Sequence, residues 1–157
     1  MMKGPKELGF NGVFSVSPKG EISLVDDTFL RPNGIAFSPD ESLLYVNDTA
    51  RQQIIVFSAD KDKKTKKTGL FAQVDPSYGE GVVDGMKVDI EGNVYVTGPG
   101  GVWVFSPDGN ALAILFIPEK VGNLCFGGKD SKTLYITAST SVYSLAVGIP
   151  GIVPFRN

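Results

Sequence analysis

Short apolar runs separated by polar turns fill most of this chain. Residues 33–58, NGIAFSPDESLLYVNDTARQQIIVFS, contain an apolar run, a turn, a second run with a central tyrosine, another turn and a third run. The same plan recurs in residues 84–107 and 122–146. Short runs rich in β-branched and aromatic residues, bounded by Gly, Pro, Asp and Asn, are typical of strands. The pattern predicts an all-β protein built from repeated units, with central tyrosines at Tyr45, Tyr95 and Tyr135.

A fourth apolar run follows the first two units, at residues 70–74 and 112–117. Four antiparallel strands per unit, repeated about every 40 residues, are typical of a β-propeller blade. The predicted blades span about 33–75, 84–118 and 122–146. A β-sandwich is the alternative all-β architecture, although a sandwich does not require its units to resemble one another.

The N-terminal residues 12–27, GVFSVSPKGEISLVDD, match the second half of the middle unit: Val13 aligns with Val102 and Gly20 with Gly109. They predict a half-blade, so that residues 1–157 form a single partial propeller domain of about three and a half four-stranded antiparallel blades. Such a partial ring would leave strand edges unpaired, which is an aggregation hazard. The chain is therefore expected either to be a fragment or to form a homodimer that closes a ring.

The composition is that of an ordinary globular protein, with 15 basic and 17 acidic residues and a net charge of −2. This balance gives no reason to expect nucleic acid or an anionic membrane as a partner. The lysines of residues 58–69 are interrupted by Asp60 and Asp62, which predicts a solvated hairpin tip. The sequence shows neither an apolar run of the ~18 residues that span a membrane nor the apolar core of a signal peptide. A cytoplasmic location is expected.

The chain contains no histidine and one cysteine, Cys125. Ser-His-Asp catalysis, Cys-His catalysis and histidine metal ligands are therefore excluded within this chain, as is an intrachain disulfide. Cys125 lies in the apolar run NLCFGG, where we expect a small buried hydrophobic residue rather than a nucleophile.

Two polar residues stand just before the first strands of their units, Asn33 before IAF and Asp84 before MKV. In a propeller these first strands line the central channel, so both side chains are expected to converge on the axis. Their oxygens suit a hard divalent cation, and Asp84 could also act as a general base. The alternative is that both residues only cap turns, because Asn-Gly and Asp-Gly are common turn pairs. Two interpretations also stay open for Asp48. Its side chain either approaches the face of the propeller where Asn33 and Asp84 lie, or accepts hydrogen bonds within the turn DTAR.

Three stretches together resemble the gluconolactonase family, the six-bladed propeller lactonases that include the senescence marker protein (regucalcin). They are RPNGIAFSPDESLLYVNDTA at 31–50, DGMKVDIEGNVYVTGPGGVWVF at 84–105 and NLCFGGKDSKTLYITASTSVY at 123–143. They occur in family order, and the resemblance covers about residues 8–146. It implies that this chain forms the C-terminal half of such a propeller.

The resemblance also implies a divalent cation, calcium or zinc, on the propeller axis. The family's Asn and Asp ligands fall on Asn33 and Asp84, and Asp84 is also the implied acid/base residue. A bound cation would polarise the carbonyl of a small-molecule lactone and activate water, so ring opening would need no histidine.

The chain departs from the family pattern at several positions. The family's glutamate ligand and a further asparagine come from blades earlier than any matched here. Glu7 and Glu21 lie outside the matching motif, and no motif supports Arg31 or Arg51 as substrate contacts. In a homodimer, each copy would contribute Asn33 and Asp84, giving four oxygen ligands around one axis.

The sequence thus favours a metal-dependent lactone hydrolase of which this chain is one half. Two alternatives stay open. One is a non-catalytic half-propeller that binds a ligand or partner, and the other is a propeller that performs a different reaction.

Overall fold

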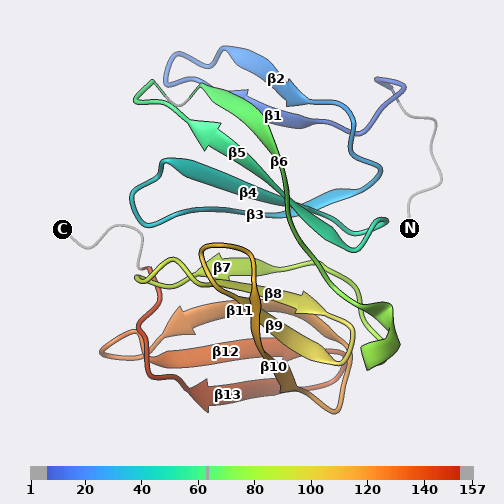
Figure 1. The fold of residues 1–157 in the computed structure, drawn as a ribbon, viewed down its shortest axis with the longest axis vertical. Coiled ribbons are helices and arrows are strands. Elements are labelled where there is room, and N and C mark those ends of the chain that lie inside the picture. The colour runs from blue at the N-terminus through green and yellow to red at the C-terminus, as the bar shows by residue number, and fades with distance from the viewer. Residues whose placement is uncertain (1–6, 63, 153–157) are drawn as a thin grey trace.

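The repeated pattern folds into antiparallel β-structure along nearly all of the chain (Figure 1). A computed structural model describes residues 7–62 and 64–152, and these contain thirteen strands and one short 3-10 helix. The strands are β1 Val13–Val16, β2 Ile22–Asp26, β3 Pro32–Phe37, β4 Leu43–Asp48, β5 Gln53–Ala59, β6 Thr65–Gln73, β7 Met86–Val88, β8 Val94–Gly98, β9 Gly101–Phe105, β10 Ala111–Phe116, β11 Val121–Gly127, β12 Thr133–Ala138 and β13 Val142–Ala146. The helix η1, Pro76–Tyr78, joins β6 to β7. The prediction of an all-β fold is confirmed.

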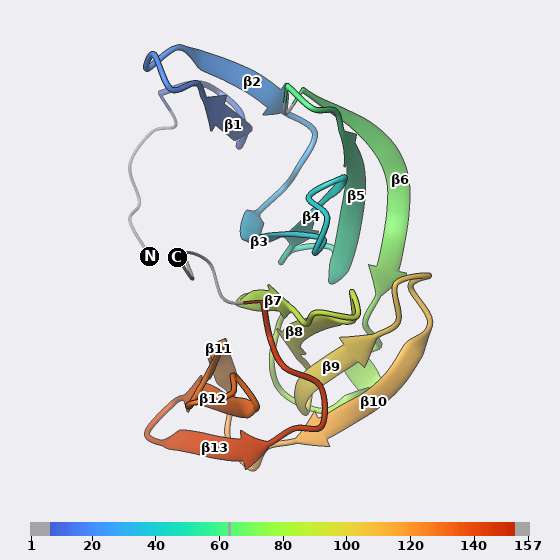
Figure 2. The same cartoon turned by 90° about the vertical axis from the view of Figure 1, so that its left-hand side faces the viewer.

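The strands form four antiparallel sheets: β1–β2, β3–β6, β7–β10 and β11–β13. Within each sheet, every strand pairs with its neighbour in the chain, and the turns that join them are short. Figure 2 shows the four sheets following one another around an arc, with β3, β7 and β11 on its inner side and β2, β6, β10 and β13 on its outer side. A β-sandwich would instead place two sheets face to face.

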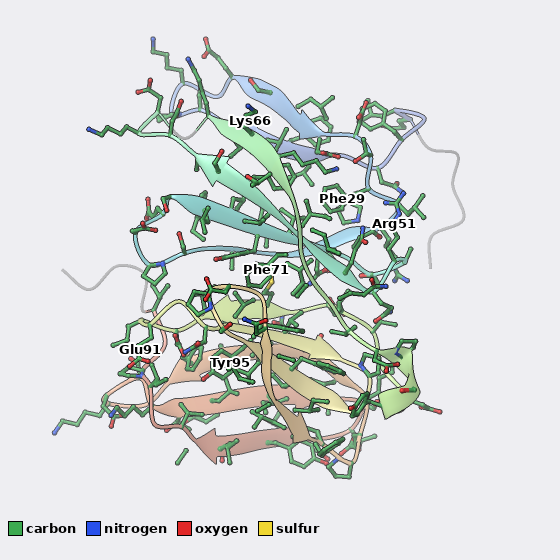
Figure 3. The ribbon with its side chains drawn as sticks, viewed as in Figure 1. Phe29, Arg51, Lys66, Phe71, Glu91 and Tyr95 are labelled. Carbon is green, nitrogen blue, oxygen red and sulfur yellow. The ribbon has the colours of Figure 1, made fainter. Side chains whose placement is uncertain are left out.

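A hydrophobic core fills each space between neighbouring sheets. The largest lies between β3–β6 and β7–β10 and includes Tyr45, Met86 and Trp103. Figure 3 shows Phe71 between these two sheets, where its ring lies 4.7 Å from that of Tyr45 and 6.4 Å from that of Phe105. The two central strands of the middle sheet, β8 and β9, are consequently buried on both faces, and each consists of five buried residues. This explains why their sequences read as continuous apolar runs instead of alternating ones.

The two outermost sheets are covered on one face only. In β1–β2, Val13 is buried against the next sheet, whereas four apolar side chains on the other face are exposed. Their exposed fractions are 42% for Phe14, 67% for Val16, 71% for Ile22 and 49% for Leu24.

At the opposite end of the arc, the β11–β13 sheet is likewise covered on one face only. Cys125 lies on its uncovered face, so the prediction that this residue is buried is wrong. Along β11, Leu124 points into the core and Cys125 points to the other side, where it pairs with Tyr135 of β12. No further sheet covers that side among the described residues, so Cys125 is exposed. In the same described ranges, no helix has both the length and the apolar character needed to cross a bilayer.

Candidate functional site

The starts of the inner strands β3 and β7 lie against each other. Gly34 follows Asn33, and a Cβ atom placed on it would overlap the carbonyl oxygen of Asp84. A Cβ atom on Gly85 would likewise overlap the side chain of Asn123 at the start of β11. Only glycine allows the backbones to approach so closely. The two Gly positions that follow Asn33 and Asp84 in sequence therefore bring the three inner strand starts into one row.

Asn47 connects two of these strand starts. Its side chain is fully buried at the end of β4, where its Oδ1 accepts a hydrogen bond from Gly34 N at 3.0 Å. Its Nδ2 donates to the backbone oxygen of Asp84 at 2.8 Å. Because Gly34 bonds to a side chain, the ladder between β3 and β4 shifts register between Pro32 and Ile35. Asn33 consequently lies in an irregular stretch inside β3, not ahead of the strand as its sequence suggested.

The amide of Asn33 has a fixed orientation. Thr49 Oγ1 donates its proton to the backbone oxygen of Val83 at 2.7 Å. It can therefore only accept from Asn33, whose Nδ2 lies 3.3 Å away. The side-chain oxygen of Asn33 then points away from this contact, and no donor bonds to it within residues 7–62 and 64–152. The result is an exposed amide oxygen that is free to bind a ligand.

Asp84 is held by its backbone while its carboxylate stays free. Its backbone N donates to Thr97 Oγ1 at 3.0 Å, and the same hydroxyl lies 3.3 Å from the backbone oxygen of Val82. The half-buried carboxylate accepts no hydrogen bond from any residue that the structure describes. Both predicted ligands therefore present oxygens that are not used to stabilise the fold.

A hollow of about 240 Å³ opens beside Asp84. Lys120 and Gly122 also line it, and Gly122 occupies in the third repeat the position that Asn33 and Asp84 occupy in the first two. A Cβ atom on Gly122 would meet nothing within 4 Å, so this position adds open space where the other repeats place a polar side chain. The lining residues are Val82, Asp84, Lys120, Val121, Gly122, Thr137, Ala138 and Ser139.

The structure gives Asp48 a structural role. Its carboxylate is completely buried and accepts hydrogen bonds from Leu30 N, Arg31 N and Ala50 N at 2.9 to 3.1 Å. Arg51 adds an ion pair at 2.7 Å and also donates to Thr28 O. Burial alone would raise the pKa of Asp48, but these donors outweigh it and lower the pKa. Asp48 and Arg51 therefore fix the chain ahead of β3.

The remaining sequence candidates lie elsewhere. Glu21 is in the turn between β1 and β2, where it accepts a hydrogen bond from Ser17 Oγ at 3.4 Å. Glu7 is exposed ahead of β1, and the side chain of Arg31 is exposed. None of these three, nor Asn33, lines the hollow beside Asp84.

Three residues that position or line this site carried no recognisable motif. Asn47, Thr49 and Lys120 lie in a strand, a turn and a connection that resemble many others. One weak signal was available for Asn47, because the equivalent positions of the other repeats hold Thr97 and Thr137, which are also polar. Each of these side chains bonds to the first strand of its own unit or to the segment just before it.

The oxygen atoms of Asn33 and Asp84 are of the type that a hard cation prefers, but they are too few to complete its coordination. Calcium takes six to eight oxygen ligands, roughly, and prefers carboxylate and amide oxygens. Asn33 and Asp84 supply two such groups, and within the described ranges no three acidic, cysteine or histidine side chains cluster. The remaining ligands of a bound cation would be water, substrate or atoms from outside the described residues.

The family profile described as SMP-30/Gluconolactonase/LRE-like region matches residues 1–140 of the chain. A gluconolactonase from Zymomonas mobilis is 39% identical over 145 residues, which is 87% of this chain and 40% of that protein.

Two solved structures have the same fold. A gluconolactonase from Xanthomonas campestris is 31% identical with a TM-score of 0.80, covering 94% of this chain and 47% of that one. A calcium-binding regucalcin from Agrobacterium tumefaciens is 23% identical with a TM-score of 0.77, covering 90% of this chain and 54% of that one. The chain thus spans about half the length of the relatives it matches.

Proposed function

Because the chain belongs to the SMP-30/gluconolactonase/LRE-like family, we propose that it supplies about half of a metal-dependent hydrolase of sugar lactones. One observation carries the proposal. The amide oxygen of Asn33 and the carboxylate of Asp84 lie at adjoining strand starts, and neither is used in the hydrogen bonding of the fold.

In this proposal the four sheets are blades of a six-bladed β-propeller. The sheets β3–β6, β7–β10 and β11–β13 are three blades, and β1–β2 is the outer half of another. In Figure 2, β3, β7 and β11 lie on the inner side of the arc, and in this proposal that side faces the central axis. A structural match to about half of each relative agrees with this interpretation.

Asn33 and Asp84 would hold a calcium or zinc ion at the axis. When bound, such a cation supplies Lewis-acid chemistry, polarising the lactone carbonyl and making water more acidic. The contacts of Thr49 and Asn47 keep the amide and the carboxylate in position without using their free oxygens. Asp84 would also accept the proton of the attacking water, since its carboxylate has no competing donor within the described chain.

Two oxygen ligands are fewer than such a cation requires, so the site needs a complement. One candidate is a second copy of the chain, which would add its own Asn33 and Asp84. The other is the part of a six-bladed ring that the family's longer members contain.

Calorimetric titration of the chain with calcium and with zinc tests the metal site, using Asp84→Asn as the variant. Loss of second-sphere partners weakens metal binding by roughly 10- to 100-fold, and we expect at least that loss for a direct ligand. Asp108→Asn is the matched control, because Asp108 is an exposed aspartate in the β9–β10 turn.

Hydrolysis of gluconolactone, followed with a pH indicator, tests the reaction. We expect turnover that a chelator abolishes and that Asp84→Asn removes, while Asp108→Asn retains it. Turnover that survives both the chelator and Asp84→Asn would contradict the proposed role of these residues. Ligand binding without any turnover, insensitive to the chelator, would favour a non-catalytic binding module.

A further inference from the structure

The hollow between Asp84 and Lys120 has the chemistry of a second binding site next to the proposed metal ligands. We propose that it binds the far end of the lactone and selects substrates whose far end carries an anionic group. The inference extends the proposed function, because the reacting end of the same molecule would lie at Asn33 and Asp84.

Lys120 is the charged donor of this hollow. Within residues 7–62 and 64–152, no carboxylate pairs with its ammonium group. The neighbouring Glu119 is already occupied, because its carboxylate accepts hydrogen bonds from Thr140 N at 2.7 Å and from Tyr143 OH at 2.7 Å. Glu119 does not line the hollow. Lys120 therefore offers its positive charge to a ligand.

The backbone that carries Lys120 is well anchored. Val121 pairs with Ala138 at the start of the β11–β12 ladder, and Ser139 Oγ lies 3.4 Å from the backbone oxygen of Lys120. On the other side, Gly85 N donates to Gly122 O at 3.1 Å. These contacts fix the distance between the segment of Lys120 and the segment of Asp84, so both ends of a ligand would meet groups on a rigid frame.

The hydroxyls of the hollow suit a polyhydroxylated ligand. Thr137 Oγ1 and Ser139 Oγ each donate to a backbone carbonyl, at 3.3 Å and 3.4 Å respectively. Their protons are thereby used, which leaves the oxygens as acceptors for ligand hydroxyls. An ammonium donor for an anion, next to hydroxyl acceptors for sugar hydroxyls, matches a sugar lactone that bears a carboxylate.

Gly122 provides the room for such a ligand. It has no side chain where the other two repeats have Asn33 and Asp84, and a Cβ atom there would point into open space. Since Gly122 lines the hollow and a Cβ atom there meets nothing within 4 Å, a larger side chain at this position can be used to block it.

A matched pair of lactones tests the proposal by binding, without the need for turnover. Glucaro-γ-lactone carries a carboxylate where glucono-γ-lactone carries a hydroxymethyl group. We expect calorimetry to give a dissociation constant about five- to tenfold lower for the anionic lactone, the range of one partly exposed charge pair. Lys120→Gln should abolish this preference, and Lys19→Gln, which removes the same charge from the distant β1–β2 turn, should retain it. Gly122→Val should weaken the binding of both lactones.

Three results would overturn the proposal: no binding of the anionic lactone, a preference that persists in Lys120→Gln, or unchanged binding to Gly122→Val. Calcium titration without lactone reports on Asn33 and Asp84 alone. Failure of the metal site and failure of the lysine subsite are therefore separate results.

Discussion

Asn47 shows how a single buried amide can hold two sheets in register. It is completely buried, and its two hydrogen bonds join the β3 strand to the segment just ahead of β7. We expect Asn47→Ala to lower the free energy of unfolding by about 2 to 3 kcal/mol, because it leaves Gly34 N and the Asp84 carbonyl unsatisfied. Urea denaturation measures this difference. Asn110→Ala, at an exposed turn, should change stability by less than about 0.5 kcal/mol.

If Asn47→Ala were as stable as Asn110→Ala, water would be satisfying both backbone groups. The amide would then not be what joins the sheets. Cation affinity should fall along with stability in Asn47→Ala, since the spacing of Asn33 and Asp84 depends on the same contacts.

The hydrogen bonds of Glu119 should make the free energy of unfolding depend on pH. Hydrogen bonds from Ser141, Tyr143 and Thr140 lower its pKa from 4.5 to about 2. Because folding lowers this pKa, the ionised carboxylate stabilises the native state above pH 4.5, and the contribution is lost as the pH falls toward 2. We expect Glu119→Gln to be less stable than the parent at pH 7, with the difference shrinking through that window. Urea denaturation of both proteins across the acid range measures it, and a pH-independent difference would contradict the assignment.

At the scale of the elements, the closeness of β3 and β7 depends on glycine. A methyl group at Gly34 would overlap both the Asp84 carbonyl and the Asn47 side chain. Overpacking of this kind costs roughly 1 to 3 kcal/mol, so Gly34→Ala should lower the midpoint of thermal unfolding. Gly148→Ala, where a Cβ atom would meet nothing within 4 Å, is the control and should be nearly neutral. Equal midpoints would mean that the strands separate easily.

The strands themselves could be predicted from sequence because the same pattern of apolar runs and polar turns occurs in three units. Residues of β5, β9 and β13 were recognised by comparing three units, and the short β7 strand was found from its place after Asp84. The fourth strands β6 and β10 match apolar runs that follow the repeats, although β6 begins earlier, at Thr65.

Other features depend on contacts between sheets, which a local pattern does not contain. The sequence pointed to Asn33 and Asp84 but not to Asn47, whose partners belong to β3 and to the segment ahead of β7. Lys120 lacked any motif and becomes notable only beside the hollow. Cys125 was mistaken for a core residue because an apolar run does not reveal which side of its strand is covered.

At the scale of the whole molecule, the uncovered face of β1–β2 presents four exposed apolar side chains, Phe14, Val16, Ile22 and Leu24. A contiguous apolar face of this kind favours association. We expect the purified chain to form a dimer, with a mass in light scattering of about twice 16.8 kDa. Ile22→Lys should return it to a monomer, whereas Ile90→Lys, at an exposed apolar residue in the β7–β8 turn, should not.

A monomeric parent chain would contradict ring closure by two copies. Asn33 and Asp84 would then need their remaining metal ligands from a different polypeptide segment.

The packing around Asn33 also bears on how this protein ages chemically. An Asn-Gly pair deamidates when the glycine nitrogen attacks the asparagine side chain to form a succinimide. Gly34 N donates a hydrogen bond to Asn47, and the Asp84 carbonyl lies so close that a Cβ atom on Gly34 would overlap it, so we expect that the ring cannot close without opening the sheets. The chain contains a second such pair, Asn11–Gly12, ahead of β1. On prolonged incubation, peptide mapping should find isoaspartate at Asn11 well before Asn33, and Asn47→Ala should remove that protection.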